Sequence, residues 1–230
     1  MEPHELTIKI ATWNVNSLKV RLPQVLDWLA QNQPDVLALQ ETKLTDADFP
    51  TLDIAEAGYQ SVFAGQKTYN GVAILSRALA SDVVTDLPGM DDPQRRVLGA
   101  TIGDVRVLNL YIPNGQAVGS DKYAYKLAWL EKLTAWMETE LARYPKLVML
   151  GDFNIAPEDR DVHDPVAWTG QVLCSEPERA AFQRLQASGL KDAFRFFPQE
   201  EHSFSWWDYR AAAFRRNLGL RIDHILVSPA

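Results

Sequence analysis

The 230-residue chain lacks several features that mark specialised classes of protein. It has one cysteine, Cys174, so no intramolecular disulfide can form and a disulfide-rich secreted scaffold is excluded. No apolar stretch approaches the roughly 18 residues that a membrane-spanning helix needs. The first residues, MEPHELTIKI, lack the basic start and apolar run of a signal peptide. We therefore expect a cytoplasmic protein with no membrane partner.

Positive charge is also scarce. The 23 Lys and Arg residues are outnumbered by 30 Asp and Glu residues, which gives a formal net charge of −7. Phosphate binding needs local positive charge, so this balance disfavours a nucleic-acid partner unless basic residues gather on one face. The candidates for such a face are Lys43, Lys67, Arg95, Arg96, Arg210, Arg215, Arg216 and Arg221. A solvated surface is the alternative interpretation of each residue.

The chain does contain enough apolar material for a large core. Apolar residues make up 47% and charged residues 23% of the sequence, as in ordinary globular proteins. We find no repeat, no low-complexity stretch and no long Gly/Ser linker. The simplest organisation is therefore one domain over residues 1–230.

Short apolar runs of β type recur along the chain, and several are nearly continuous, as in strands buried between layers. The predicted strands are residues 8–15, 36–40, 60–64, 71–76, 96–102, 105–112, 146–151 and 222–228. Helical periodicity appears at residues 22–31, 123–143 and 176–188. This mixture predicts an α/β fold, a four-layer sandwich of two packed, mainly antiparallel sheets flanked by helices.

Polar side chains stand where several predicted strands end. They are Asn14 with Asn16, Glu41, Asp152 with Asn154, and Asp223. A single polar residue at a strand end is most often a turn former or a helix cap. If these strand ends converge at one edge of the packed sheets, however, their side chains surround one pocket. Their oxygen atoms suit Mg²⁺ or Mn²⁺, and no Cys/His cluster has the spacing of a zinc site.

Seven segments carry a family resemblance. In chain order they are TWNVNSLKVR, LQETK, NGVAILSR, LNLYIPNG, LGDFNIAP, FSWWDYR and GLRIDHIL. From about Ile8 to the end, this series resembles the motifs of the exonuclease III family of abasic-site endonucleases, in the DNase I-like endonuclease/exonuclease/phosphatase superfamily. GDFNIAP and QET also occur in the superfamily's lipid and inositol phosphatases. YIPNG, FSWWDYR and GLRID point to the DNA-repair branch.

The resemblance implies a metal-dependent phosphodiesterase that acts on DNA. Its Mg²⁺ or Mn²⁺ would sit on the scissile phosphate and stabilise the leaving 3′ oxygen. Glu41 is implied as the principal ligand, with Asn14 nearby, and Asp152 and Asn154 complete the metal-binding set. Asp152 is also implied to activate water or to protonate the leaving group, and both roles stay open.

Four side chains besides Asp152 are implied to take part in catalysis or in phosphate binding. Tyr111 resembles the family's catalytic tyrosine, although a half-buried core tyrosine is the alternative. Asn154 follows Asp152 by two residues, which in an extended backbone puts both side chains on one side. Asn154 would then donate to a phosphate oxygen as charge builds there. Asn114 would contact phosphate, and Asp223 would act in catalysis by orienting a histidine.

The implied substrate pocket is apolar. Trp206, Leu220 and Ile222 match the positions that surround a base-free sugar in the family, and extruding such a sugar costs little unstacking. Arg210 adds positive charge beside them. Core packing is the alternative for Trp206 and Trp207, and we expect one of the two in the core because neighbours in a strand face opposite sides.

One family feature is missing, a Ser-Asp-His triplet whose histidine is a general base or a phosphate contact. The histidines of this chain are His4, His163, His202 and His224. None stands in a suitable place, and strand alternation directs His224 away from Asp223. We therefore expect the natural protein to continue past Ala230. We also expect these 230 residues to bind metal but to turn over about 10²–10⁴ times more slowly than a complete site.

The predicted function is DNA repair. A monomer would act on double-stranded DNA, incising 5′ to abasic sites, removing 3′ blocking groups and nucleotides, or both. Loops such as residues 161–174 would set the balance between these activities. Two alternatives stay open: the same fold acting on a non-DNA phosphoester, or a non-catalytic DNA-binding relic.

Overall fold

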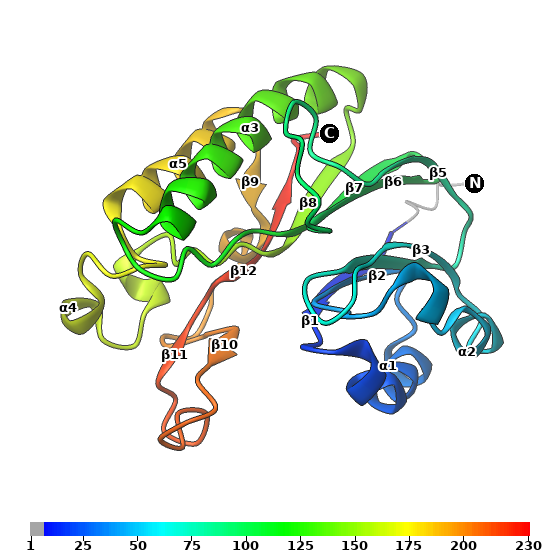
Figure 1. The fold of residues 1–230 in the computed structure, drawn as a ribbon, viewed down its shortest axis with the longest axis horizontal. Helices are drawn as coiled ribbons and strands as arrows, with labels where there is room; N and C mark the ends of the chain where they lie inside the picture. The colour runs from blue at the N-terminus through cyan, green and yellow to red at the C-terminus, as the bar shows by residue number, and fades with distance from the viewer. Residues whose placement is uncertain (1–6) are drawn as a thin grey trace.

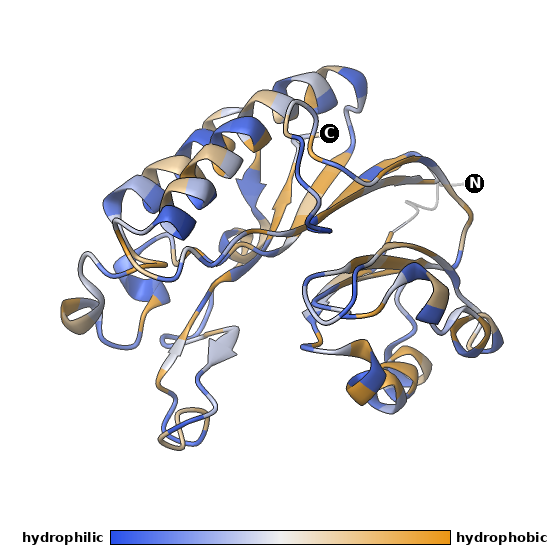
Figure 2. Ribbon diagram, in the orientation of Figure 1, coloured by the Kyte–Doolittle hydropathy of each residue, from blue (hydrophilic) through white to orange (hydrophobic). Residues whose placement is uncertain are grey.

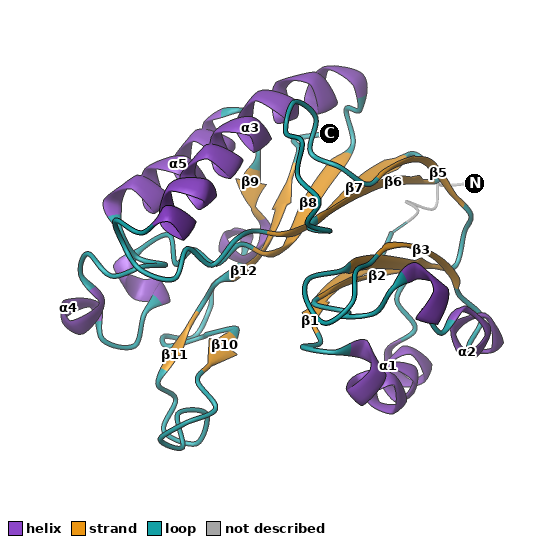
Figure 3. Ribbon diagram, in the orientation of Figure 1, coloured by secondary structure: helices purple, strands orange, loops and turns teal. Residues whose placement is uncertain are grey.

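Two β-sheets packed against each other, with helices on both outer sides, make up the computed structural model, which describes residues 7–230 (Figure 1 and Figure 3). The first sheet has the order β1-β2-β4-β3, formed by β1 (Ile10–Asn14), β2 (Val36–Gln40), β3 (Gln60–Ala64) and β4 (Val72–Ser76). The second has the order β5-β6-β7-β8-β12-β9, formed by β5 (Ala80–Val84), β6 (Val97–Ile102), β7 (Val105–Tyr111), β8 (Leu147–Asp152), β9 (Lys191–Asp192) and β12 (Asp223–Val227). Strands β1 and β2 are parallel, as are β7 and β8, and the other paired strands are antiparallel. The predicted four-layer α/β sandwich is confirmed.

The outer layers are helical. Helices α1 (Leu18–Asn32) and α2 (Thr51–Glu56) cover the first sheet, and α3 (Asp121–Arg143) and α5 (Glu176–Ala187) cover the second (Figure 1). Within residues 7–230, no helix has both the length and the hydropathy needed to cross a membrane. The shorter elements are 3₁₀ helices η1 (Asp46–Asp48), η2 (Asp159–Asp161) and η3 (Ala193–Phe196), helix α4 (Pro165–Trp168), and a two-stranded ribbon of β10 (Trp206–Trp207) and β11 (Gly219–Leu220).

The predicted strands and helices are present, and strand ends move by at most two residues. Helix α1 begins four residues earlier than its periodicity predicts, so Pro23 lies inside it. Proline removes a helical hydrogen bond, but tertiary contacts hold this helix start. The N–H groups of Ser17 and Leu18 donate to the carbonyls of Glu41 and Thr42, at 2.8 and 3.0 Å. The sequence pattern did not predict β5 and α2, nor β9 and α4, which are too short to show a period. Three of the five residues of β5 are exposed, so it lacks an apolar run.

Strand β2 shows how the apolar pattern builds the layers. Val36 and Ala38 face the second sheet, and Leu37 and Leu39 face the helices of their own side. All four side chains are buried, which explains why the strand is a continuous apolar run. The longer strands of both large sheets are accordingly hydrophobic, whereas hydrophilic and hydrophobic residues alternate along the helices (Figure 2).

A polar contact joins the two sheets inside this apolar interface. Gln40 Nε2 donates to Asn109 Oδ1 at 2.7 Å, which links the end of β2 to β7. Asn109 Nδ2 in turn donates to the carbonyls of Leu39 and Ala73, at 2.9 and 2.8 Å. Buried hydrogen bonds of this kind favour one relative placement of their elements. Because Glu41 follows Gln40, the contact also fixes Glu41 relative to the second sheet.

Gly151 in β8 provides a test of this packing. A Cβ atom there would lie 2.0 Å from the carbonyl oxygen of Leu110 in β7, and its φ of +133° disfavours any other residue. We expect Gly151→Ala to lower the free energy of unfolding by at least about 2 kcal/mol, because a backbone carbonyl cannot move aside.

Gly103→Ala is the matched control for this prediction. Its φ is +62°, but a Cβ there has no neighbour within 4 Å, so only backbone strain of roughly 1 kcal/mol is expected. Urea unfolding of the two variants checks the difference. Equal losses would contradict the close approach of β7 and β8.

Candidate functional site

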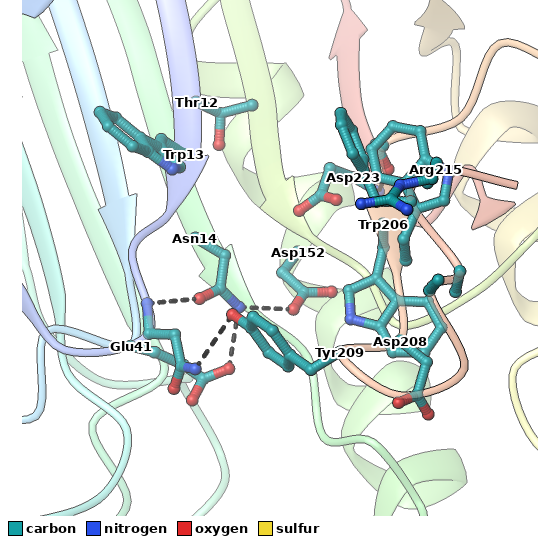
Figure 4. Close-up of a pocket in the computed structure, with 16 residues that line it drawn as sticks. Thr12, Trp13, Asn14, Glu41, Asp152, Trp206, Asp208, Tyr209, Arg215 and Asp223 are labelled. Carbon is teal, nitrogen blue, oxygen red and sulfur yellow. Dashed lines mark hydrogen bonds between the residues drawn. The ribbon is translucent and has the colours of Figure 1, made fainter. Parts of the chain in front are cut away.

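The ends of strands from both sheets meet at a cavity of about 770 Å³. Asn14 ends β1, Glu41 follows β2, Asp152 ends β8 and Asp223 begins β12. All four residues line the cavity (Figure 4). The structure thus brings together the predicted polar residues of four separate segments, because adjacent strands end at the same edge of the sandwich.

The side-chain amide of Asn14 connects the two sheets at this cavity. Its Nδ2 donates to Glu41 Oε1 and to Asp152 Oδ2, both at 2.9 Å (Figure 4). The N–H of Asn16 donates to Asn14 Oδ1 at 3.0 Å. A flipped amide would point its oxygen at two carboxylates and its NH₂ at an N–H group, so this orientation is fixed.

Unusual backbone conformations turn the first-sheet residues into the cavity. Asn16, Glu41 and Lys43 have φ values of 43°, 55° and 55°, in the left-handed region. Such conformations cost of order 1 kcal/mol or more each and persist only where other contacts impose them. Here the N–H of Lys43 donates to the carbonyl of Asn70, and Lys43 Nζ lies 3.1 Å from Glu41 Oε2. Glu41 is therefore held by Asn14 on one oxygen and by Lys43 on the other.

Asp152 and Asp223 are direct cross-strand partners in the β8–β12 pair. Like charges in such positions repel. Burial raises the pKa of Asp152 to about 6, and Glu41 adds to the rise, whereas hydrogen bonds from Asn14 and Asn154 oppose it. Burial, and then the charge of Asp152, hold the pKa of Asp223 well above its usual range. The carboxyl groups of Asp152 and Asp223 therefore keep their protons up to a higher pH than ordinary aspartate side chains do.

The donor set fits a hydrated divalent cation. Within residues 7–230, no three His, Cys, Asp or Glu side chains stand close enough to enclose a metal ion by themselves. Mg²⁺, however, keeps several waters and takes one or two protein carboxylates, which Glu41 and Asp152 provide. The amide oxygen of Asn14 accepts a hydrogen bond from the N–H of Asn16, which leaves it one lone pair for a metal in this arrangement.

Asn154 departs from the expected geometry. Its φ is 50°, so the prediction of an extended backbone from Asp152 to Asn154 is wrong, and asparagine is among the residues that tolerate this left-handed turn. Its N–H donates to Asp152 Oδ1 at 2.9 Å, and its Nδ2 donates to the carbonyl of Ile112 at 2.9 Å. Asn114 Nδ2 donates to Asn154 Oδ1 at 3.1 Å. Neither asparagine is among the residues that line the cavity.

Tyr111 ends β7, beside Asp152 in the parallel β7–β8 pair. The guanidinium carbon of Arg96 lies 4.7 Å from the centre of its ring. Burial raises the pKa of Tyr111 above its ordinary value, and the charges of Glu41 and Asp152 add to the rise. The phenol therefore stays protonated at neutral pH and can donate a hydrogen bond.

An aromatic segment forms the opposite wall of the cavity. Trp206, Trp207, Tyr209 and Phe214 all line it. Both tryptophans are half-buried, so the prediction that one of them lies in the core is wrong. The physical reason is that the β10–β11 ribbon has only two strands, and both tryptophans line the open cavity.

Leu220 and Ile222 take a different place from the one predicted. Both are buried in a cluster with Val162 and Leu173, and Trp206 packs against this cluster. Neither residue lines the cavity, so in this structure they support Trp206 from behind. The family pattern indicated the neighbourhood correctly but not which side chains reach its surface.

Three of the predicted basic residues take different places in the structure. Arg210 lies beside the cavity, exposed and paired with Asp208 at 2.8 Å, and Arg215 lines the cavity. Arg221 is buried and paired with Asp161 at 2.7 Å, so its place on a basic face is a wrong prediction. A solvent-facing arginine and a buried one look alike in sequence, because the difference depends on a carboxylate 60 residues away.

Tyr209 was not assigned a role in the predicted site, although it lines the cavity. Its hydroxyl accepts a hydrogen bond from Asn16 Nδ2 at 3.3 Å, which connects the aromatic wall to the end of β1. Its ring is shown between Glu41 and Trp206 in Figure 4. The exposed residue belongs to the FSWWDYR segment, and that motif was the signal that could have suggested it.

No histidine among residues 7–230 lines this cavity. His163 and His202 border a separate hollow near η3, and His4 lies outside the described residues. His224 points away from Asp223, as alternation predicts, with Nε2 2.8 Å from the carbonyl of Ile155. The site as described holds carboxylates, amides and aromatic side chains.

Comparisons with known proteins show which family this fold and sequence resemble. The family model described as "Endonuclease/Exonuclease/phosphatase family" matches residues 11–230. An exodeoxyribonuclease III from Haemophilus influenzae is 35% identical, over 96% of this chain and 88% of the relative. The structure of the Neisseria 3′ phosphatase NExo bound to a product DNA hairpin is 53% identical, with a TM-score of 0.95 over 97% of this chain and 87% of that one. An AP endonuclease from Archaeoglobus fulgidus is 39% identical, with a TM-score of 0.92 over 97% and 87% of the two chains.

The paired carboxylates predict a pH-dependent stability difference. A carboxyl whose pKa is raised in the folded state contributes stability below its unfolded pKa, and that contribution is lost as pH rises through the folded pKa. For Asp152 this window runs from about 4 to about 6. Asp223→Asn removes one of the repelling charges, so we expect it to stabilise the protein by roughly 1 kcal/mol at pH 7.5.

Urea unfolding of wild type and Asp223→Asn between pH 4.5 and pH 7.5, in the presence of chelator, measures this difference. The stability difference should be small at the acid end and should grow as pH rises. A difference independent of pH, or a variant less stable than wild type at pH 7.5, would show that the two carboxylates do not repel each other.

Proposed function

Because the chain belongs to the endonuclease/exonuclease/phosphatase family, we propose that it is a metal-dependent DNA-repair nuclease of the exodeoxyribonuclease III type. The observation that carries this proposal is the cavity in which Asn14 joins Glu41 to Asp152 opposite a wall of aromatic side chains. Carboxylates suit a metal on a phosphate, and aromatic rings suit the flat or apolar parts of a nucleotide.

The cofactor is Mg²⁺ or Mn²⁺, held by Glu41 with Asp152 beside it. When bound, the metal supplies Lewis-acid stabilisation of charge on the scissile phosphate and its leaving oxygen. Asp152 moves the proton, either from the attacking water or to the leaving 3′ oxygen, and a pKa of about 6 suits either role near neutral pH. Tyr111 donates a hydrogen bond to a phosphate oxygen, because its phenol keeps its proton.

Asn154 and Asn114 support Asp152 without lining the cavity themselves. The N–H of Asn154 orients the Asp152 carboxylate, and Asn114 holds the side chain of Asn154. A phosphate contact by either amide requires it to exchange one of its present hydrogen bonds. Asp223 lies opposite Asp152 as its cross-strand partner and completes the carboxyl pair on the second-sheet side of the cavity.

The substrate is double-stranded DNA with an abasic site or a 3′ end. Trp206 and Tyr209 offer a surface for a sugar or for the last nucleotide, and Arg215 supplies positive charge within the cavity. The Neisseria relative is named as a 3′ phosphatase and the Archaeoglobus relative as an AP endonuclease. Both activities share one chemistry, so both substrates belong in the test. The protein acts as a monomer of one domain.

A non-DNA phosphoester is the alternative substrate within the same fold. The aromatic wall favours DNA, since it presents several rings on which bases and sugars can pack. A non-catalytic relic is disfavoured because Asn14, Glu41 and Asp152 keep two carboxylates close together at an open cavity, an arrangement that costs stability in a protein without a bound cation.

The experiment compares an internal abasic duplex with a nicked duplex that carries a 3′ phosphate, each with Mg²⁺ and with chelator. Wild type should process at least one of the two, only with metal. Asp152→Asn should lower the single-turnover rate by about 10²–10⁴, the usual cost of losing a positioned acid–base group. Asp53→Asn, an exposed carboxyl on α2, is the matched control and should leave the rate unchanged.

The proposal fails if wild type binds DNA but cleaves neither duplex with Mg²⁺ or Mn²⁺. Hydrolysis of inositol phosphates without any action on DNA would show that the substrate is a non-DNA phosphoester. Equal rates for Asp152→Asn and Asp53→Asn would show that Asp152 takes no part in the proton transfer.

A further inference from the structure

The loop after β8 is held by three side chains from three different elements. Three successive carbonyls accept their hydrogen bonds: that of Asn154 from Lys126 Nζ at 2.6 Å, that of Ile155 from the His224 ring at 2.8 Å, and that of Ala156 from Arg179 Nε at 3.0 Å. Lys126 lies on α3, His224 on β12 and Arg179 on α5. Loop carbonyls usually bond to water or to nearby backbone, so three side-chain partners in a row indicate a loop whose shape is imposed.

Lys126 is the most constrained of the three. It is fully buried, and its ammonium group contacts three acceptors: the carbonyls of Asn154 and Asn114, and a carboxylate oxygen of Glu178. An ammonium has three donors, so all of its hydrogen-bonding capacity is used. The hydrocarbon stem packs beneath Gly115, where an added Cβ would lie 3.1 Å from Lys126 Cδ. One side chain thus fastens the loop after β7 to the loop after β8.

Glu178 is fixed as firmly as its partner. It is fully buried near the start of α5, where it forms a capping box with Ser175. One oxygen accepts from the N–H of Leu173 at 3.0 Å and the other from the N–H of Ser175 at 3.2 Å. Ser175 Oγ also lies 2.6 Å from the hydroxyl of Tyr123. The ion pair is therefore part of a fully bonded network, which makes it rigid.

A buried ion pair is weak evidence of stabilisation, because apolar residues of similar volume often stabilise a core as well or better. The Lys126–Glu178 pair instead fixes the positions of the backbone carbonyls that Lys126 binds. Asn154 has a left-handed backbone, its N–H donates to Asp152, and its side chain bonds to Asn114. Lys126 binds the carbonyls of both asparagines, and so sets the position from which Asp152 is oriented.

We infer that Lys126 is a positioning residue for the nuclease reaction, with Glu178 as the anchor of its charge and Arg179 as a second support of the same loop. The inference rests on the proposed function. Lys126 touches neither substrate nor metal, and acts through Asn154 on the Asp152 carboxylate. A carboxylate misplaced by about 1 Å loses roughly 10²-fold in rate.

The test uses Lys126→Met, which keeps the apolar stem and removes the donors. We expect kcat on the better of the two DNA substrates to fall roughly 10²-fold while KM is unchanged, since the substrate surface is intact. Leu133→Ala, a buried α3 residue seven positions after Lys126, controls for lost stability, and exposed Lys132→Met controls for lost charge. Assays run at a temperature where all variants are folded.

Amide hydrogen exchange supplies a second readout that does not depend on activity. Lys126→Met should speed exchange in residues 153–157 more than in the rest of the second sheet, whereas Leu133→Ala should affect the sheet evenly. Arg179→Met releases the Ala156 carbonyl without leaving a charge alone in the core, and should lower kcat in the same direction but less. It keeps the inference testable if Lys126→Met does not fold.

The outcomes separate this inference from the proposed function. If wild type cleaves DNA and the Lys126 and Arg179 variants match Leu133→Ala in kcat, the positioning role is wrong and the nuclease assignment stands. If wild type cleaves nothing, the assignment fails, and selective exchange in residues 153–157 still decides whether the side chains hold the loop. Uniform exchange in both variants would overturn the inference.

Discussion

The rest of the site depends on one unfavourable contact, the approach of carboxylates from two different sheets. The amide of Asn14 bridges Glu41 and Asp152, and Asp223 stands directly opposite Asp152. Negative charges brought together in a partly buried place must be relieved by a proton or a cation. Burial raises the pKa of Asp152 and the charge of Glu41 adds to the rise, so a proton relieves part of this constraint, and a divalent metal is the other means of relief. The proposed metal binding and proton transfer therefore follow from how the sheets end.

The fold keeps this contact in place with rigid supports on each side. The Gln40–Asn109 hydrogen bond fixes the sheets relative to each other just before Glu41. On the far side, Gly151 lets β8 approach β7 closely, and Lys126 holds the loop that follows. Natural proteins accept strain and buried charge where function needs them and offset the loss in the core. Here the large apolar clusters between the layers supply that offset.

Much of this architecture could be predicted from the sequence. The long apolar strands and the periodic helices carry local signals, and the order of the motifs fixed the family. What could not be predicted depends on contacts between distant segments. Arg221 is buried because Asp161 meets it, and Tyr209 reaches Asn16 only because the aromatic segment folds over the cavity. The left-handed turn at Asn154 is likewise imposed by its tertiary hydrogen bonds and not by residue type alone.

The central claim is that the Glu41 and Asp152 carboxylates form a cation site, and unfolding in the presence of Mg²⁺ tests it most directly. A ligand that binds only the folded state raises the free energy of unfolding. At pH 7.5, millimolar Mg²⁺ should raise the urea midpoint of wild type and should have little effect on Glu41→Gln, which keeps the shape of the site and loses its charge. The same Mg²⁺ effect on both proteins, or no effect on wild type, would contradict the account.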